Sequence, residues 1–366
     1  MYVKSLELKD FRNYEQLNMR FNEGTNILYG DNAQGKTNVL EGIYLCGTTK
    51  SHKGSKDREI IRLGAEEAHI RMLVERKEVV HKIDMHLKKN KPKGVAIDGI
   101  PIRKSSELFG LIHMVFFSPE DLGIIKNGPN YRRRFLDLEL CQLDKVYLYN
   151  LTNYNKVIQQ RNNLLKQINS KNHELYDTLS IWDQQLLHYG SEIILRRKLF
   201  ISQLNQIIVG IHNKLSNRRE NLIVEYEPNV SAEEFEEKLA RNVERDIFLK
   251  TTSVGPHRDD MTFLIEEKDL RKYGSQGQQR TTALSLKLSE IELVKQVTKD
   301  KPVLLLDDVL SELDRLRQNQ LLSSISDIQT IVTCTGLEEF VNNRVNYDTI
   351  YKVVQGEVFK ENIPLQ

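Results

Sequence analysis

The residues with the clearest chemical meaning form one short loop near the start of the sequence. Residues 30–37 read GDNAQGKT and match the pattern G-x-x-x-x-G-K-[ST] at every fixed position. In this pattern backbone N–H groups surround the phosphates, the lysine reaches the β- and γ-phosphates, and the final hydroxyl binds Mg²⁺. A strand-like segment precedes the loop and a helical pattern follows it from about residue 36 to 46. We therefore predict ATP binding by Gly30, Asp31, Asn32, Ala33, Gln34, Gly35, Lys36 and Thr37.

An acidic pair that could complete this site stands near the other end of the chain. Residues 304–308 read LLLDD, in which apolar residues of a buried strand are followed by Asp307 and Asp308. P-loop enzymes hold Mg²⁺ with a carboxylate at the end of such a strand, so Thr37 and Asp307 are predicted to bind the metal. Asp308 is predicted to act with Lys36 in catalysis by orienting or deprotonating the attacking water. A helix-capping or outer role for Asp308 stays open.

The distance between these two motifs indicates the architecture. Lys36 and Asp307 are 271 positions apart (307 minus 36), which small GTPase-like folds do not show. Apolar residues recur at helical spacing on both sides of a polar break at 169–172, which predicts two long helices folded back on each other. We expect an α/β head built from both chain ends, with a short helical arm inserted. The approximate limits are 1–130 and 251–366 for the head and 131–250 for the arm. One charged helix is expected near residues 232–249 and a long helix at residues 275–297.

A segment rich in glutamine, YGSQGQQR at residues 273–280, precedes the acidic strand. Ser275 can cap the helix that follows, and Gln278 completes an S-x-x-Q capping box. A helix that begins with serine and glycine presents free N–H donors, which suit a γ-phosphate. An ordinary helix start would explain the segment on its own, but its place just before the acidic strand favours a nucleotide contact.

Together these motifs resemble the ABC-type heads of the SMC and Rad50 class, and most closely the RecF family. The resemblance covers residues 11–314, nearly the whole chain. It is carried by FRNY at 11–14, GDNAQGKTN at 30–38, FSPEDL at 117–122, GPNYRRRFLD at 128–137, GPHRDD at 255–260, YGSQGQQR at 273–280 and LLLDDVLSELD at 304–314. The resemblance implies an ABC-type, SMC/Rad50-like P-loop head.

The resemblance also implies that ATP is bound between two copies of the chain. In that class two ATP molecules are sandwiched, each between one subunit's phosphate loop and the partner's signature segment. Matched residue by residue, the implied positions are Ser275, Gly277 and Gln278 for ATP contact in trans, Asp314 for the dimer seam, and Arg12 and Asn13 for the nucleotide.

Slow hydrolysis and a role on DNA are further implications of the resemblance. ABC heads usually carry Gln where Ser118 and Pro119 stand here, and Glu where Asp308 stands. A weak, DNA-stimulated ATPase used as a switch is therefore expected. RecF-like proteins act in recombinational repair, replication restart and the SOS response. They bind single-strand/double-strand DNA junctions and help RecR and RecO to load recombinase, so DNA, RecR and RecO are the expected partners.

Local basic clusters are candidates for the DNA contact. The net charge of +2 carries no information on nucleic acid, because 53 basic side chains nearly balance 51 acidic ones. Non-specific binding through backbone phosphates would be salt-sensitive. The candidates are Lys50, Lys53, Lys56, Arg58, Lys88, Lys89, Lys91 and Lys93. Solvated loop charges would explain each cluster equally well. A structural role and an interface role are both open for Arg132–Arg134.

Two other classes were weighed against the RecF-like switch. A chromosome-structuring SMC or Rad50 head needs a long coiled coil, which an arm of about 100 residues cannot form. An ABC transporter subunit usually has a glycine-richer signature and a hydrolytic glutamate. No run of about 18 apolar residues is present, so no membrane span is expected. Three dispersed cysteines and an N-terminus without an apolar signal core favour the cytoplasm.

Overall fold

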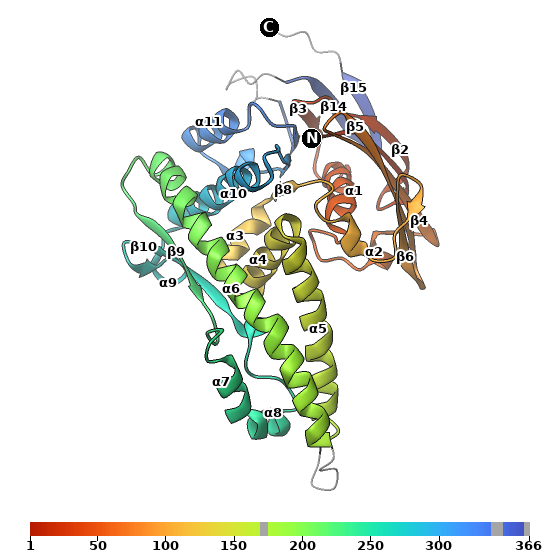
Figure 1. The fold of residues 1–366 in the computed structure, drawn as a ribbon. Helices are drawn as coiled ribbons and strands as arrows, with labels where there is room; N and C mark the ends of the chain where they lie inside the picture. Colours follow the sequence, from red (N-terminus) through yellow and green to blue (C-terminus); the bar gives the residue numbers. More distant parts are fainter. Residues whose placement is uncertain (169–174, 338–346, 362–366) are drawn as a thin grey trace. The chain divides into compact units, whose positions relative to one another are not determined.

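The protein folds into two compact units in a computed structural model that describes residues 1–168, 175–337 and 347–361. Unit 1 comprises Met1–Asp121 and Glu290–Gln366, and unit 2 comprises Leu122–Ser289. Unit 1 is therefore built from both ends of the chain, as Figure 1 shows by its red-to-orange and blue ribbons. The segment 251–289, which we expected to function with the head, is part of unit 2, so the functional limits at 130/131 and 250/251 stay a prediction.

The first sheet of unit 1 is antiparallel, in the order β2-β1-β4-β5-β6-β7. Its strands are β1 (Tyr2–Phe11), β2 (Tyr14–Arg20), β4 (Glu67–Arg76), β5 (Val79–Lys88), β6 (Lys91–Ile97) and β7 (Ile100–Pro101). Along β4 the buried side chains of Ala68, Ile70, Met72 and Val74 alternate with more exposed ones. One face of this sheet therefore packs on the core of unit 1, while the other faces solvent.

The second sheet of unit 1 has the order β15-β14-β3-β13-β12-β8 and is parallel except for β15. Its strands are β3 (Thr25–Tyr29), β8 (Met114–Phe117), β12 (Val303–Asp307), β13 (Thr330–Cys334), β14 (Thr349–Val354) and β15 (Glu357–Glu361). Every residue of β12 and β13 is buried, as expected for strands covered on both faces. Because parallel strands end at one edge, the loop after β3 and the acids after β12 meet there.

Helix α1 (Lys36–Thr48) contacts both sheets of unit 1 and lies almost wholly buried between them. It begins at Lys36 as predicted and ends two residues beyond the predicted Cys46. The other helical segments of unit 1 are α2 (Asp57–Ile60), α11 (Arg315–Ser324) and 3₁₀ turns at Ser105–Leu108, Pro119–Asp121 and Leu310–Glu312. The burial of α1 fixes the end of the phosphate loop, since the loop leads directly into this helix.

Unit 2 contains the two long helices that the sequence predicted. They are α5 (Lys145–Leu165) and α6 (Leu175–Leu215), and they pack along each other. The polar break predicted at 169–172 lies outside the described residues. A three-stranded sheet accompanies the helices, with β9 (Leu222–Glu227), β10 (Asp260–Ile265) and β11 (Lys268–Asp269). The remaining segments are α3 (Leu122–Lys126), α4 (Pro129–Leu143), α7 (Phe235–Arg241), α8 (Val243–Leu249), a 3₁₀ turn at Pro256–Arg258 and α9 (Leu270–Tyr273).

Two helix predictions near the end of unit 2 had different outcomes. The charged stretch at 232–249 was expected to be one helix, and this was wrong because α7 and α8 are separated at Asn242. The Asn242 side chain donates to the Lys238 carbonyl at 2.7 Å, a local bond of the kind that competes with helix continuation. The long helix expected from residue 275 to 297 is confirmed as α10 (Gln276–Thr298), which runs from unit 2 into unit 1.

Buried ion pairs hold the elements of unit 2 together. Arg197 of α6 is 2% exposed and binds Asp259 at 2.9 Å and Asp137 at 2.7 Å. Its guanidinium also donates to the Pro256 carbonyl at 2.7 Å, and its Nε donates to the Tyr147 hydroxyl oxygen at 3.0 Å. One arginine therefore joins α4, α5, α6 and the segment before β10.

The arginine run at 132–134 contributes to the same region. Arg132 forms a two-pronged ion pair with the Asp260 carboxylate at 2.6 and 2.8 Å. Arg133 donates to the Asp259 carbonyl at 2.6 Å. Both side chains therefore link α4 to the start of β10, so they have a structural role within unit 2.

Candidate nucleotide-binding site

The phosphate loop leaves β3 and enters α1 through glycines that no other residue could replace without strain. Gly35 has φ +119°, and a Cβ there would lie 2.6 Å from Asn13 Nδ2 and 2.8 Å from Tyr14 Oη. At Gly30, a Cβ would lie 2.3 Å from the Val353 carbonyl oxygen. Both glycines therefore let neighbouring groups approach the backbone closely. The loop residues Asp31, Asn32 and Ala33 between them are exposed.

Lys36 is the first residue of α1, and its ammonium group points back into the loop. The residue is 7% exposed, and Nζ donates to the carbonyls of Gly30 at 2.5 Å and Asp31 at 2.8 Å. Burial lowers the pKa of Lys36, while the nearby carboxylates of Asp308 and Asp307 act in the opposite direction. Within the described residues Lys36 forms no ion pair, so an anion in the loop would be its strongest partner.

Thr37 and Asp307, the two residues predicted to bind Mg²⁺, are in direct contact. The Thr37 hydroxyl donates to Asp307 Oδ1 at 2.8 Å. Ligand oxygens 2.0–2.1 Å from an octahedral Mg²⁺ are separated by about 2.9 Å along each edge, so this spacing fits the ion. The pair consists of a hydroxyl and a carboxylate, the oxygen donors that Mg²⁺ prefers. The described residues therefore fit the expected metal.

Asp308 stands next to this pair in a strained backbone conformation. Its φ of +53° is rare for a residue with a side chain and costs about 1 kcal/mol. Its N–H points to the backbone oxygen of Thr333 at 3.2 Å and to the hydroxyl at 3.0 Å, and the Ser311 hydroxyl donates to its carbonyl at 2.8 Å. Burial raises the pKa of the Asp308 carboxyl, and Asp307 adds to this effect. A raised pKa brings a carboxylate closer to the range useful for a base.

Thr333 is a functional residue that the sequence reasoning missed. It lies on β13, and its hydroxyl donates to Asp307 Oδ1 at 2.8 Å while its backbone and hydroxyl receive the Asp308 N–H. Thr333 thus holds both acidic residues in place. Its position at the carboxyl end of a buried apolar strand, beside the strand that carries the acids, was the signal that could have identified it.

Arg12 and Asn13, which were expected to touch the nucleotide, have partners within unit 1. Arg12 forms a two-pronged ion pair with Glu41 of α1, with both contacts at 2.8 Å. Burial opposes ionisation of Glu41, but the hydrogen bonds from Arg12 and Ser51 hold the pKa of this carboxyl below its usual value. Asn13 donates to the Gln34 carbonyl at 3.0 Å. The two residues brace α1 and the loop, and a direct nucleotide contact stays a prediction.

The hairpin between β14 and β15 also supports the loop, which the sequence reasoning did not foresee. The Gln355 N–H donates to Gln34 Oε1 at 2.6 Å, and the Gly356 N–H donates to the Gln34 carbonyl at 3.1 Å. On the other side, the Tyr14 hydroxyl donates to the Gly35 carbonyl at 3.1 Å. Hydrogen bonds from the β14–β15 hairpin and from Tyr14 therefore hold the loop on two sides.

The signature segment belongs to unit 2 and forms the helix cap that the sequence predicted. The Gln278 N–H donates to Ser275 Oγ at 3.2 Å, and the Ser275 N–H donates to Gln278 Oε1 at 2.8 Å. This confirms the capping box. Ser275 and Gly277 are exposed at the start of α10. In unit 1, Asp314 caps α11 by accepting the Arg317 N–H at 3.0 Å.

The basic residues proposed for DNA fall into two groups. Within the described residues, Lys50, Lys53, Lys56, Arg58 and Lys91 form no ion pair and are exposed. The other three are neutralised, in the pairs Lys88–Glu67 at 2.9 Å, Lys89–Glu66 at 2.8 Å and Lys93–Asp57 at 2.9 Å. Lys93 therefore ties its strand to α2, and the first group retains more charge for a ligand.

A phosphate loop and an acidic strand brought together from opposite chain ends define an ABC-type ATPase head. The chain matches the family model described as RecF/RecN/SMC N terminal domain over residues 2–358. Two crystal structures of Smc heads share this fold, with TM-scores of 0.57 at 17% and 16% identity. Within the described residues, no helix is long and apolar enough to cross a membrane.

Within this class, the chain belongs to the RecF family. It is 70% identical over 98% of its length to the DNA replication and repair protein RecF of Lachnoclostridium phytofermentans, whose whole length is matched. The RecF of Lachnospira eligens is 64% identical over 99% of this chain and 100% of the relative. A solved structure of the recombination mediator protein RecF with ATP, in the RecFOR pathway, has a TM-score of 0.91 at 36% identity. It covers 99% of this chain and 98% of that one.

Proposed function

We propose that this chain is an ATP-dependent DNA-binding protein of recombinational repair and replication restart, in which ATP holds two copies together on DNA. The observation that carries the proposal is the contact of Thr37 with Asp307 beside the buried Lys36, since it assembles a phosphate and Mg²⁺ site. Its relatives are named DNA replication and repair proteins, which supports a role in recombinational repair and replication restart.

The dimer part of the proposal rests on the exposed start of α10. Ser275 and Gly277 are exposed, so the positive end of this 23-residue helix is accessible to an incoming phosphate. In the proposed dimer, Ser275, Gly277 and Gln278 of one copy contact the ATP held by the other copy's loop. Asp314 then lies along the seam between the copies.

The switch part of the proposal rests on Asp308. Aspartate is one methylene shorter than the glutamate usual in ABC heads, so its carboxylate reaches less far toward an attacking water. Its backbone is held by Thr333 and Ser311, which leaves little freedom for adjustment. Hydrolysis is therefore slow, and the time until ATP is hydrolysed sets how long the dimer lasts. Thr37 and Asp307 hold the Mg²⁺ ion in this site.

On DNA, the proposed dimer binds backbone phosphates near a single-strand/double-strand junction. Lys50, Lys53, Lys56 and Arg58 are favoured for this contact over the lysines at 88–93, since most of the latter are paired with carboxylates. With RecR and RecO, the dimer then helps to load recombinase in the cytoplasm, as part of the SOS response.

A mixing experiment tests whether the site is shared between copies. Lys36→Ala removes the loop's charge and Ser275→Arg blocks the signature, so each variant alone should fail to dimerise with ATP in light scattering. In a mixture, the loop of the Ser275→Arg copy faces the intact signature of the Lys36→Ala copy, which restores one site per heterodimer. Ser180→Arg, an exposed serine of α6, is the control and should dimerise normally.

Three outcomes would contradict the proposal: ATP-driven dimers of Lys36→Ala, dimers of Ser275→Arg alone, or a mixture that does not dimerise.

A second experiment tests the DNA contact. The triple variant Lys50→Ala, Lys53→Ala and Lys56→Ala should weaken binding of a gapped duplex. The slope of log affinity against log salt concentration should become less steep, by the contribution of about three phosphate contacts. The variant Lys88→Ala, Lys89→Ala should change binding less, and equal losses in the two variants would remove the preference for the first cluster.

A further inference from the structure

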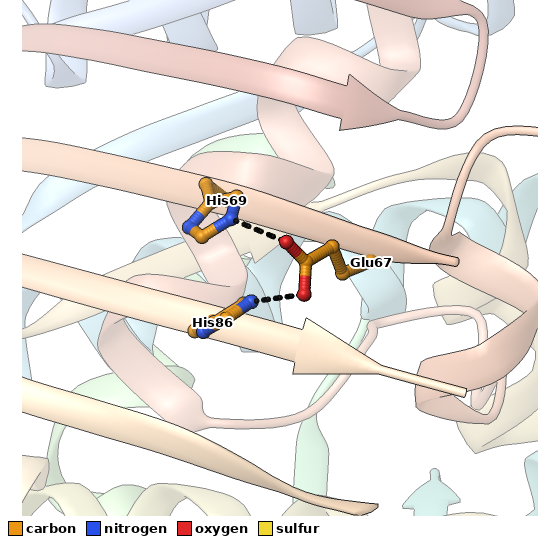
Figure 2. Close-up of side chains that lie close together, drawn as sticks. All are labelled: Glu67, His69 and His86. Atoms are coloured by element: carbon orange, nitrogen blue, oxygen red, sulfur yellow. Dashed lines mark hydrogen bonds and ion pairs between the residues drawn. The ribbon is translucent and has the colours of Figure 1, made fainter. Parts of the chain in front are cut away.

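Three side chains gather on the solvent face of the first sheet, far from the phosphate loop in sequence. Glu67 and His69 are two residues apart on β4, so both project from the same face. His86 on β5 pairs directly with His69 in the antiparallel register. The backbone pattern alone therefore brings two imidazoles and a carboxylate together, as Figure 2 shows.

The three groups converge on a small volume. His86 Nε2 lies 3.1 Å from Glu67 Oε2, and His69 Nε2 lies 3.6 Å from Glu67 Oε1. One ligand atom from each residue lies within 4.8 Å of the other two. In a tetrahedral site with bonds of about 2.0–2.1 Å the ligand atoms are about 3.3 Å apart, a spacing close to these two N···O distances, each of which involves a different oxygen of the carboxylate.

We propose that Glu67, His69 and His86 bind a divalent transition-metal ion, with Zn²⁺ as the best fit. Two imidazole nitrogens and one carboxylate oxygen suit Zn²⁺ and exclude Mg²⁺ or Ca²⁺ as the preferred ion, since those require oxygen ligands. Three protein ligands leave a fourth position for water or another ligand. A surface groove of about 650 Å³, lined by His69 and His86 among others, gives access to this position.

The surroundings of the site set its affinity. Lys88 Nζ lies 2.9 Å from Glu67 Oε2, so this ion pair occupies one oxygen of the carboxylate. Lys88 therefore competes with a metal ion for Glu67 and must move away when a metal ion binds. Lys9, opposite His69 on β1, adds positive charge. Removal of Lys88 should therefore strengthen metal binding.

The imidazole rings also need a small rotation to act as ligands. They are stacked, with centroids 3.9 Å apart and planes at 24°. Ring nitrogens bind a metal in the plane of the ring, so the planes must turn toward each other to share one ion. Both side chains are partly exposed, at 47% for His69 and 34% for His86, which leaves room for this movement.

The test is a titration of the full-length chain, stripped of metal by a chelator and free of nucleotide, with Zn²⁺ against a colorimetric indicator. We expect one equivalent to bind, and Co²⁺ in its place to give the visible absorption of a tetrahedral ion. His69→Ala and His86→Ala should each lower the affinity at least tenfold, Glu67→Gln severalfold, and Lys88→Met should raise it severalfold. Millimolar Mg²⁺ should not compete.

His81→Ala is the matched control, because His81 lies on the same strand β5 and is paired with Asp98 at 2.9 Å rather than with the cluster. It should bind Zn²⁺ like the unchanged chain. Thermal unfolding checks that each variant is folded, which we expect because the three side chains are on the solvent face. If His69→Ala and His86→Ala bind Zn²⁺ as tightly as His81→Ala, the proposal is wrong.

Discussion

Lys36 in the phosphate loop and Arg197 in unit 2 are both buried cations, but their partners differ in kind. Lys36 is 7% exposed and, within the described residues, its Nζ donates hydrogen bonds only to the backbone carbonyls of Gly30 and Asp31. Arg197 is 2% exposed and lies between the carboxylates of Asp259 and Asp137. The chain therefore pairs Arg197 directly with two carboxylates, whereas Lys36 contacts carbonyl dipoles and has the carboxylates of Asp307 and Asp308 nearby without an ion pair to either.

This difference separates stability from binding. A buried charge is costly unless opposite charges and hydrogen bonds replace its lost hydration. At Arg197 the carboxylates of the protein replace the lost hydration, so this residue stabilises the fold of unit 2. At Lys36 the protein replaces the lost hydration only in part, which leaves a strong attraction for an anionic ligand. Four variants can test this contrast, from the largest expected effect to the smallest.

Arg197→Met should have the largest effect, because it leaves the buried carboxylate of Asp259 without its cation. The free energy of unfolding should fall by about 3–5 kcal/mol. Urea unfolding followed by circular dichroism measures the change. The neighbouring Arg196, which is 43% exposed and pairs with Asp144, is the control. Arg196→Met should cost less than about 1 kcal/mol, and equal losses in the two variants would contradict the contrast.

Lys36→Ala should weaken ATP binding strongly and leave the stability of the fold almost unchanged. ATP affinity should fall about 100-fold, or ~3 kcal/mol, because the charged contact to the phosphates is lost. The free energy of unfolding should stay within about 0.5 kcal/mol or rise, since Lys36 lacks a carboxylate partner. Equilibrium binding of a fluorescent ATP analogue and urea unfolding give the two quantities. A large loss of stability would show that Lys36 serves the fold as Arg197 does.

His257 tests whether unit 2 tolerates a buried charge that has no carboxylate partner. Its Nδ1 lies 2.7 Å from the Tyr154 hydroxyl and its Nε2 lies 3.0 Å from the Thr252 carbonyl, and burial lowers its pKa to about 4 from 6.5. Between these values the unfolded chain binds a proton that the folded chain excludes. The free energy of unfolding should therefore fall as pH is lowered through this window, by about 3 kcal/mol.

The pH effect is isolated by comparison with His257→Gln, which has no titrating ring. The difference in unfolding free energy between pH values above and below this window should be about 3 kcal/mol smaller in the variant. Because the substitution also changes hydrogen bonds, the two slopes are compared rather than the absolute stabilities. Parallel slopes would mean that His257 takes up its proton without unfolding.

Thr333→Val should have the smallest effect and act on hydrolysis. The substitution keeps the shape of the side chain but removes the hydrogen bond to Asp307 and one of two to the Asp308 N–H. A loss of ~1 kcal/mol in positioning corresponds to a roughly fivefold to tenfold slower ATP turnover. ATP affinity should change less than twofold. Thr330→Val, at the other end of the same strand, is the control and should leave turnover unchanged.

Of the two regions compared, the sequence alone predicted much of the phosphate-loop region but not the ion pairs around Arg197. The phosphate loop, α1 and the acidic strand follow from local patterns: glycine and lysine spacing, a helical period and an apolar run. Thr37 and Asp307 were predicted to bind one metal ion from opposite chain ends, and the two residues are in contact because parallel strands end at one edge. The capping box at Ser275 is likewise a local pattern.

The rest depends on tertiary contacts that leave no local pattern. Arg197 looks like any charged residue on a helix, and only the packing of α4, α5 and α6 buries it with Asp259. Gln355 meets Gln34 because β14 pairs with β3, which the sequence does not indicate. The break at Asn242 was missed because the charged stretch on both sides has a continuous helical composition.

The position of β3 has a consequence for the timing of synthesis. Its two neighbours in the sheet are β13 and β14, and β13 begins 301 positions after β3 ends (330 minus 29). A ribosome adding about 5–20 residues per second needs roughly 15–60 s to cover that interval. During this time the nascent chain carries a complete phosphate-loop motif with no sheet to hold it. The first sheet, whose strands all lie within residues 2–101, can form early, whereas the capacity to bind nucleotide arises only after β13 and β14 have been synthesised.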